Sequence, residues 1–386
     1  MLELILYGLY GLLTLVSIFF VWKLMFAFKH FKVKQLLSEP SMLKDLPSVS
    51  VCIPARNETV AMTQCLERVI ASRYPKLEVI VLDDSSADNT SYLIKSFAHS
   101  GVRFVEGSKL PDGWLGKNHA LQGLLNEASG SLVLFMDVDT QVAPDTIEQL
   151  VSYLKQEKAS MISVLPMRND GYRVSVLLGT LRYFWELMRH KSGRPAVASS
   201  AWMIDRKLLI DDLGGFKQIK SDIQPEAKLA TRLSAQNAYR FLIGTPMLGV
   251  SFEKKWESQI DTSVRLLYPI LGGHLSGAMF GFVFLLILNL PTIFIVDGFI
   301  HGWTVIQIVA LWQSCIFIAI YARYLDKVWA KAWWLGALLW PYIIAQELAV
   351  LIISVVRYRL GDVSWKGRPI TSLASSSQLS RQVKRS

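Results

Sequence analysis

Residues 132–140 read LVLFMDVDT. The run Leu132–Met136 is apolar throughout, which is typical of a short buried strand, and it leads directly into Asp137-Val138-Asp139. Two carboxylates that follow such a strand place hard oxygen ligands close together, and Mg²⁺ or Mn²⁺ can be held by one or two carboxylates plus substrate phosphates. An Asp-x-Asp triplet alone also fits a solvated turn or a helix cap, so its surroundings decide between these interpretations.

Short apolar runs alternate with helical stretches on both sides of this strand, from Val49 to about Val250. We expect strands at Val49–Ile53, Leu77–Leu82, Val102–Val105 and Leu132–Met136, and helices near 59–72, 87–98, 117–128 and 144–156. This alternation predicts an α/β domain with a mostly parallel sheet that is covered by helices on both faces. Ligands of such sheets bind outside the carboxyl ends of the strands.

Three of the expected strands end in polar segments. The first leads into Arg56-Asn57-Glu58, the second into Asp83-Asp84-Ser85-Ser86, and the fourth into Asp137-Val138-Asp139. Carboxylates gathered at one edge of a sheet repel one another unless a cation or a donor-rich ligand compensates them. The three strand ends together therefore favour a metal site over a solvated turn.

Taken in order, these segments resemble glycosyltransferase family 2, which has the Rossmann-like GT-A fold. The motifs that carry the resemblance are Pro54-Ala55-Arg56-Asn57-Glu58, Leu82-Asp83-Asp84-Ser85-Ser86-Ala87-Asp88-Asn89-Thr90 and Phe135-Met136-Asp137-Val138-Asp139-Thr140. A fourth segment, Gly113-Trp114-Leu115-Gly116-Lys117-Asn118-His119-Ala120, is similar to a Trp-x-Gly-Lys segment of the membrane-bound group that includes carotenoid-acid and hopanoid-associated glycosyltransferases. The resemblance covers about residues 47–260.

The resemblance implies a site for a nucleotide-sugar, with UDP as the expected nucleotide and glucose as the expected sugar. The residues expected to bind the nucleotide-sugar are Glu58, Asp83, Asp84, Lys117 and Asp137, and the expected metal ligands are Asp137 and Asp139. Lys117 stands at the expected start of a helix, where the helix N-terminus already favours phosphate. The alternative interpretation of the segments around Glu58 and Asp84 is helix capping, with Asn57, Asp88 and Thr90 as the capping residues.

An inverting transfer needs a carboxylate that deprotonates the acceptor hydroxyl. In the family this base follows a Gly-Gly-aromatic turn, usually as Glu-Asp before a helix. Here Gly214-Gly215-Phe216 is followed by Gln224-Pro225-Glu226, so the sequence departs from the pattern. We expect Glu226 to be the catalytic base, near the positive end of a helix that Pro225 begins, with Asp222 as the alternative. An acceptor that is a carboxylic acid would need little or no base strength.

The ends of the chain indicate membrane segments. Of the 386 residues, 52% are hydrophobic and 19% are charged, and the apolar excess is concentrated at the two ends. The run from about Leu2 to Val21 is long enough to span a bilayer, and it precedes Lys23, Lys29, Lys32 and Lys34. Basic residues favour the cytoplasmic side, so the segment is expected to be a signal anchor that leaves the following domain in the cytoplasm.

Further candidate spans lie near 276–296, 303–322 and 332–355. Three C-terminal spans would place a basic tail outside the cell, against the charge rule. Either the stretch 266–296 contains two passes, or the segment with Pro341, Gln346 and Glu347 is re-entrant. Trp365-Lys366-Gly367-Arg368 resembles a tail motif of related membrane glycosyltransferases, which favours a cytoplasmic C-terminus near the active site. The expected domains are an anchor at 1–27, the GT-A domain at 28–260, a transmembrane region at 261–358 and a polar tail at 359–386.

These observations predict a multi-pass protein of the cell membrane that transfers a sugar from a nucleotide-sugar to a lipid-type acceptor with a divalent metal. The alternatives are a processive polysaccharide synthase and an inactive membrane scaffold or transporter with a nucleotide-binding domain. The net charge of +10 is explained in part by basic residues beside the apolar spans, so nucleic acid is not an expected partner. Three cysteines without metal-ligand spacing suit a reducing compartment.

Overall fold

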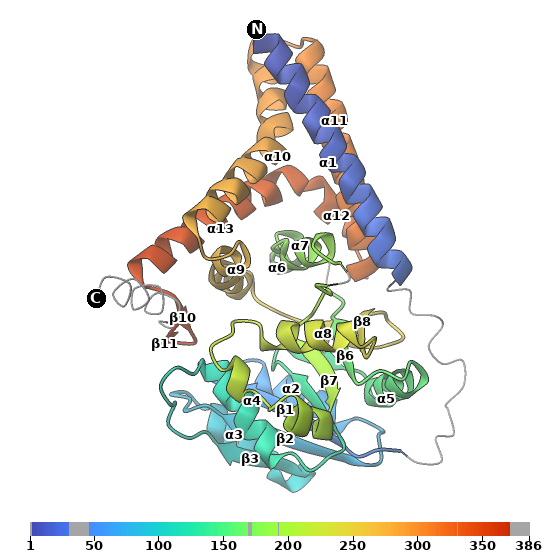
Figure 1. Cartoon of the computed structure of the whole chain (residues 1–386), viewed down its shortest axis with the longest axis vertical. Coiled ribbons are helices and arrows are strands. Elements are labelled where there is room, and N and C mark those ends of the chain that lie inside the picture. Colours follow the sequence, from blue (N-terminus) through green and yellow to red (C-terminus); the bar gives the residue numbers. More distant parts are fainter. Residues whose placement is uncertain (1, 31–45, 169–171, 192, 330, 371–386) are drawn as a thin grey trace. The chain divides into compact units, whose positions relative to one another are not determined.

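The computed structural model describes residues 2–30, 46–168, 172–191, 193–329 and 331–370 (Figure 1). Lys32 and Lys34, which follow the predicted anchor, lie outside these ranges, as does the part of the predicted polar tail from residue 371 onward. The chain divides into two compact units, and neither is continuous in sequence. The sheet unit comprises residues 31–167, 189–253 and 364–386, and the helical unit comprises residues 1–30, 168–188 and 254–363.

The sheet unit is built on a seven-stranded sheet with the order β3-β2-β1-β4-β7-β6-β8. Its strands are β1 (Val49–Ala55), β2 (Leu77–Asp83), β3 (Val102–Glu106), β4 (Leu132–Met136), β6 (Met161–Leu165), β7 (Ala201–Asp205) and β8 (Tyr239–Ile243). Only β7 runs antiparallel to its two neighbours, β4 and β6, in this sheet. The expected mostly parallel α/β sheet is therefore confirmed.

Helices and two small sheets complete the unit. The helices are α2 (Met62–Ile70), α3 (Thr90–Ser96), α4 (Gly116–Glu127), α5 (Thr146–Gln156) and α8 (Pro225–Ala235), with short turns η1 (Ala98–Ser100), η2 (Leu208–Asp212) and η3 (Lys217–Ile219). The small sheets pair β5 (Thr140–Val142) with β9 (Val250–Phe252), and β10 (Ser364–Trp365) with β11 (Arg368–Pro369). The four expected strands and four expected helices agree with β1–β4, α2, α3, α4 and α5 within about three residues at each end, a difference ordinary for such boundaries.

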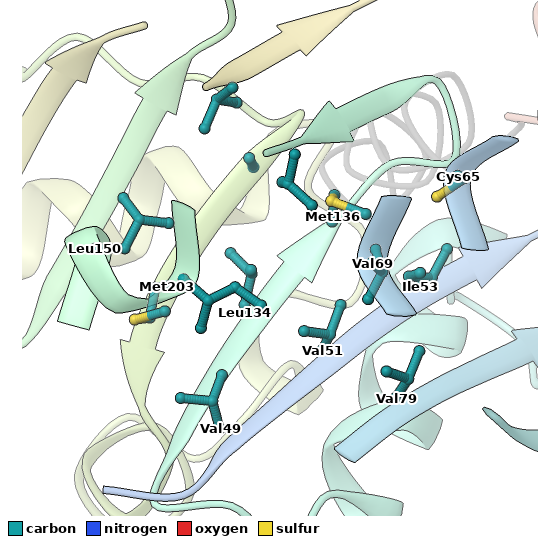
Figure 2. Packing of buried hydrophobic residues seen from close by; sticks show 14 of the residues in the cluster. Val49, Val51, Ile53, Cys65, Val69, Val79, Leu134, Met136, Leu150 and Met203 are labelled. Carbon is teal, nitrogen blue, oxygen red and sulfur yellow. The ribbon is translucent and has the colours of Figure 1, made fainter. Parts of the chain in front are cut away.

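The core explains why β1 and β4 contain no polar face. Val51, Ile53 and Leu134 point to one side of the sheet and pack with Val69 of α2 and Leu150 of α5 (Figure 2). On the other side, Phe135 of β4 packs against Trp202 and Phe216, with ring centroids 4.5 and 5.5 Å away, and α4 contacts β1 and β2. Because helices cover both faces, the central strands are buried at every position.

The helical unit contains eight helices among the described residues. They are α1 (Leu2–His30), α6 (Val174–Leu177), α7 (Arg182–Met188), α9 (Trp256–Ile270), α10 (Leu275–His301), α11 (Val305–Val328), α12 (Trp333–Leu338) and α13 (Trp340–Leu360). Three of the described helices are long and apolar enough to cross a membrane: Tyr7–Lys29 within α1, then α10 and α11. The packing of α10 against α11 and of α1 against α11 can be followed in Figure 1.

The predicted span at 332–355 differs from the structure. The chain forms α12 and then α13, and α13 is not one of the three helices of spanning length and hydropathy. Pro341 lies in the first turn of α13, and Arg357 and Arg359 lie in its last turn. The stretch 266–296 contains the end of α9, a turn at Gly272-Gly273 and most of α10, so it holds one helix of spanning length instead of two.

Candidate functional site

The carboxyl ends of β2, β1 and β4 are adjacent because these strands are neighbours in the sheet. Ala55 and Asp83 are paired in the register of β1 and β2, and the amide of Asp84 donates a hydrogen bond of 2.8 Å to the carbonyl of Ala55. The predicted convergence of the polar segments at one sheet edge thus follows from the strand order.

Hydrogen bonds join the loops that follow β1 and β2. The side-chain oxygen of Asn57 accepts from the amide of Ala87 at 2.9 Å, and the amide of Asn57 donates to the Ser86 hydroxyl at 2.9 Å. The amide of Glu58 donates to the Thr90 hydroxyl at 2.8 Å. Asn57 is held at φ 52°, a conformation that asparagine tolerates better than most residues. These contacts fix the backbone that presents Glu58.

Asp83 and Asp84 have different surroundings. The carboxylate of Asp83 accepts hydrogen bonds from the amide of Ser86 at 3.2 Å and from the hydroxyls of Ser86 and Ser91, so it stabilises the turn. The side chain of Asp84 is 1% exposed, and its Oδ1 lies 3.0 Å from Nη1 of Arg368. Burial raises the pKa of Asp84 above its ordinary value, and the charge of Arg368 opposes that shift.

Asp137 and Asp139 leave the end of β4 in a tight turn. The amide of Asp137 donates to the carbonyl of Ser200 at 2.9 Å, and the amide of Thr140 donates back to the carbonyl of Asp137 at 3.0 Å. One oxygen of the Asp137 carboxylate lies 2.7 Å from the Lys117 ammonium. Burial raises the pKa of Glu58, Lys366 opposes this rise, and the charges of Asp139 and Asp137 add to it. The negative charges at the end of β4 therefore act on the carboxylate that follows β1.

This donor set fits a hard divalent cation that a substrate also holds. Among the described residues, no group of three or more His, Cys, Asp or Glu is arranged to hold a metal ion. Asp137 and Asp139 supply carboxylate oxygens at one strand end, and Mg²⁺ or Mn²⁺ in such sites completes its shell with water and phosphate oxygens. The residues therefore suit a metal that binds together with a diphosphate.

The start of α4 carries Lys117 and is tied to the segment before α8. The side-chain amide of the buried Asn118 donates to the carbonyls of Ile219, Lys220 and Asp222 at 3.0, 3.0 and 2.8 Å. The amide of Leu115 also donates to the carbonyl of Lys220 at 2.9 Å. Asn118 therefore positions the loop that leads to Glu226. Sequence reasoning did not assign it this role, because its partners lie more than a hundred residues away.

The two candidate bases lie at the beginning of α8. Glu226 is 2% exposed and is in the first turn of the helix, directly after Pro225. Asp222 precedes the helix, and its carboxylate lies 2.9 Å from the ammonium of Lys228. The preceding turn uses Gly214 and Gly215 at φ 71° and 63°, which side chains other than glycine rarely adopt. The positive end of α8 stabilises the charged form of a carboxylate at position 226.

Two further basic residues reach this edge from the C-terminal β10–β11 hairpin. The Lys366 ammonium lies 2.9 Å from Oε1 of Glu58, and Arg368 pairs with Asp84. Sequence similarity placed the segment near the active site, but these partners are 308 and 284 residues away in the chain (366 − 58 and 368 − 84), beyond the reach of any local pattern.

Comparison with known proteins finds similarity to glycosyltransferases. Residues 50–210 match the model of the family described as Glycosyl transferase family 2. The probable glycosyltransferase YdaM of Bacillus subtilis is 34% identical over 125 residues, which are 31% of this chain and 30% of that protein. The 4,4'-diaponeurosporenoate glycosyltransferase of Staphylococcus aureus (strain bovine RF122 / ET3-1) is 33% identical over 122 residues, which are 31% of this chain and 32% of that protein. The chain thus matches less than a third of each relative.

The fold has a counterpart among solved structures. Mannosyltransferase PcManGT from Pyrobaculum calidifontis, in complex with GDP-Man and Mn²⁺, superimposes with a TM-score of 0.54 and 20% sequence identity. The superposition covers 91% of this chain and 98% of the other. At this identity the likeness concerns the fold. The chain therefore has the GT-A fold, and its residues 50–210 are similar to glycosyltransferase family 2.

Proposed function

We propose that this protein is a membrane-bound inverting glycosyltransferase. It transfers a sugar from a UDP-linked donor to a lipid-type acceptor, and the proposed sugar is glucose. The observation that carries the proposal is the strand order β2-β1-β4, which brings the polar segments after these strands to one edge of the sheet, where Asp84, Glu58 and Asp137 each lie against a basic side chain. A solvated turn would not need carboxylates on three neighbouring strand ends.

Each of the grouped residues has a part in donor binding. Glu58 and Asp84 accept hydrogen bonds from the nucleoside, and Asp83 keeps the turn between them in place. Asp137 and Asp139 would hold Mg²⁺ or Mn²⁺, and Lys117, which pairs with Asp137, would supply a positive charge for a phosphate. When bound, the metal neutralises the charge that develops on the leaving diphosphate. Preorganised charges of this kind supply much of the rate of such transfers.

Glu226 is proposed as the base, with Asp222 as the alternative. A base in an inverting transfer accepts the proton of the acceptor hydroxyl as its oxygen attacks the anomeric carbon. The relative from S. aureus is named for 4,4'-diaponeurosporenoate, which supports an amphiphilic acceptor. A lipid acceptor also explains the helices of spanning length, because they keep the enzyme in the membrane, where such an acceptor is found.

The proposal is tested by extracting lipids from cells that express the wild-type chain and from cells that lack it. We expect a glycolipid that appears only with the wild-type chain, and its mass identifies both sugar and acceptor. The purified wild-type protein should also hydrolyse UDP-glucose slowly when Mn²⁺ is present. Absence of both the glycolipid and any nucleotide-sugar turnover would contradict the proposal and favour an inactive scaffold.

We further propose that α1, α10 and α11 are the membrane spans. An odd number of spans with the N-terminus outside leaves residues 28–260 and the basic C-terminal tail on the cytoplasmic side. The charge rule is then satisfied for both the predicted anchor at 1–27 and the tail at 359–386. The region 261–358 contains two spans followed by α12 and α13, which removes the conflict that a third C-terminal span would create.

We assign α13 to the membrane surface. Tyr342, Ile352, Val356 and Leu360 are between 47% and 76% exposed and recur at helical spacing on one side of α13. The other side contacts α9, where the hydroxyl of Tyr358 donates to the carbonyl of Arg265 at 2.7 Å. An apolar stripe with arginines at its end is typical of a helix that lies in the interface.

Cysteine labelling tests this topology. In a Cys315→Ser background, we expect Thr304→Cys, between α10 and α11, to react with a membrane-impermeant maleimide on intact cells. Asp362→Cys, just after α13, should react only after permeabilisation, because three spans place it in the cytoplasm. Both positions are at or near exposed turns, so each variant serves as the control for the other. Labelling of Asp362→Cys on intact cells would show that α13 crosses the membrane.

A further inference from the structure

The β10–β11 hairpin is a tight turn that carries two cations. Ser364 pairs with Pro369 and Trp365 with Arg368, which leaves Lys366 and Gly367 as a two-residue loop. Both loop residues have positive φ, 50° and 80°, as the favoured two-residue hairpin turns require. Residues 364–370 belong to the sheet unit, so the contacts of the hairpin with Glu58 and Asp84 lie within one compact unit.

Four polar contacts hold the hairpin to the loops after β1 and β2, one of them from Nη2 of Arg368 to the carbonyl of Asp84 at 3.5 Å. Lys366 pairs with Glu58 at 2.9 Å, and Arg368 pairs with Asp84 at 3.0 Å. The side chain of Arg56 donates through Nε to the carbonyl of Lys366 at 3.0 Å, and it also donates to the carbonyl of Asp84. Arg56 therefore links the hairpin backbone to the turn that follows β2.

The hairpin also packs against the start of α4. A Cβ atom added at Gly116 would lie 3.2 Å from the ring of Trp365, 3.3 Å from Oδ2 of Asp84 and 3.4 Å from Cδ of Arg368. The first two distances are tighter than nine in ten Cβ contacts, so a larger residue at position 116 would require these neighbours to shift. Lys117 directly follows Gly116 at the start of α4. Three cations, Lys117, Lys366 and Arg368, thus each lie against a carboxylate of the proposed donor site.

Several buried polar atoms of the Asp84–Arg368 pair have unsatisfied hydrogen-bonding capacity. Both carboxylate oxygens of Asp84 and Nη1 of Arg368 are buried, and in the described part of the chain none of them has a partner with hydrogen-bond geometry. Arg368 is within ion-pair distance, but an ion pair alone compensates the desolvation of two buried charges poorly. A ligand with N–H or O–H donors would satisfy Asp84 better, and it would leave the guanidinium available for an anion.

A nucleoside diphosphate has both kinds of group. We propose that the β10–β11 hairpin is a clamp for the diphosphate of the donor. The nucleoside takes over the hydrogen bonding of Glu58 and Asp84, and the displaced Lys366 and Arg368 then pair with the diphosphate oxygens. This inference rests on the proposed function, because it takes Glu58 and Asp84 to be nucleoside contacts. It adds two phosphate-binding residues from the C-terminal segment to the GT-A domain.

The test compares UDP with uridine in the presence of Mn²⁺, using the full-length protein in detergent and calorimetric titration. GDP and guanosine are titrated in parallel. For Lys366→Ala and Arg368→Ala we expect the affinity for UDP to fall about tenfold each, which corresponds to about 1.4 kcal/mol. The affinity for uridine, measured by competition, should stay the same or rise, because the cation that competes for the carboxylate is gone.

Three control variants separate a clamp from a merely structural hairpin. Arg368→Lys keeps the charge and should recover part of the UDP affinity. Arg73→Ala removes an exposed arginine that pairs with Asp145 in the same unit and should bind UDP like the wild type. Deletion of residues 371–386 leaves the hairpin intact and should also have no effect. Thermal unfolding of each variant reports whether the fold is retained.

The outcomes distinguish the clamp from the proposed function. Wild-type affinity for UDP in both alanine variants would overturn the clamp alone, as would an equal loss of UDP and uridine binding. Tighter UDP binding by Arg368→Ala would overturn it in favour of an inhibitory contact. If the wild type binds neither nucleoside diphosphate with Mn²⁺, the proposed function fails, and the clamp fails with it.

Discussion

The variant Asp139→Asn is expected to reduce kcat/KM for donor turnover by about a thousandfold. Asparagine keeps the size of the side chain but removes the charge that holds a divalent cation against the diphosphate. A bound metal contributes several kcal/mol of transition-state stabilisation, and about 4 kcal/mol corresponds to a thousandfold change in rate. Removal of metal from the wild type with EDTA should cause a loss of similar size, and added Mn²⁺ should restore the wild type but not the variant.

The matched control is Asp145→Asn, which neutralises a half-exposed aspartate of the same unit. Asp145 pairs only with Arg73 at 3.0 Å among the contacts described for it, and both side chains are largely exposed, so the pair contributes little stability. Turnover by Asp145→Asn should match the wild type. If Asp139→Asn retained most of its activity in the same assay, the assignment of Asp139 as a metal ligand would be wrong.

Glu226→Gln is expected to lower kcat by a factor of about 100 to 10,000, the usual contribution of a positioned general base. Glutamine has the shape of glutamate but cannot accept the acceptor's proton. The dissociation constant for UDP should stay within about twofold of the wild-type value, because a base acts on the acceptor and not on the donor. Steady-state kinetics with the identified acceptor, together with UDP titration, separates the two parameters.

Asp222→Asn is the companion variant. Its carboxylate is paired with Lys228, and we expect a much smaller change in kcat. A larger loss in Asp222→Asn than in Glu226→Gln would transfer the role of base to Asp222. Wild-type kcat in both variants would instead show that the acceptor needs no base, as a carboxylic acid would not.

The sheet unit could be predicted in detail where the local pattern is strong. The strand Leu132–Met136 has the predicted limits, because a buried apolar run is followed at once by aspartate. The antiparallel strand β7 was not predicted. Ala201–Asp205 is almost as buried as β4 and β6 on either side of it, so its composition carries no information about direction. Strand order and direction depend on connections that exceed the range of local periodicity.

The helical unit shows a different limit. The stretch 332–355 is apolar enough to suggest a span, but Glu347 accepts hydrogen bonds from the amide of Leu181 at 2.9 Å and from the Trp185 indole at 3.1 Å. Gln346 accepts from the indole of Trp256 at 3.1 Å. These partners on α9 and around α7 make polar residues tolerable in a packed helix. Hydropathy alone cannot distinguish such a helix from one that crosses the bilayer.

The candidate site also has a part that the sequence predicts and a part that it does not. The residues expected at the carboxyl edge follow their strands directly, and the sheet order brings Glu58, Asp84 and Asp137 to neighbouring strand ends. Asn118 and Arg368 act through partners that only tertiary structure supplies. The roles of Glu226 and Lys117 in the reaction stay predictions, since they depend on where donor and acceptor bind.

Calorimetric titration of UDP, with and without Mn²⁺, tests the central claim most directly. The wild type and a double variant, Asp137→Asn with Asp139→Asn, are compared under both conditions. We predict that Mn²⁺ strengthens UDP binding to the wild type by about tenfold or more, equivalent to about 1.4 kcal/mol, and leaves the double variant unchanged. If Mn²⁺ strengthens UDP binding equally in both proteins, these two aspartates do not hold the metal against the nucleotide, and the account of the site is wrong.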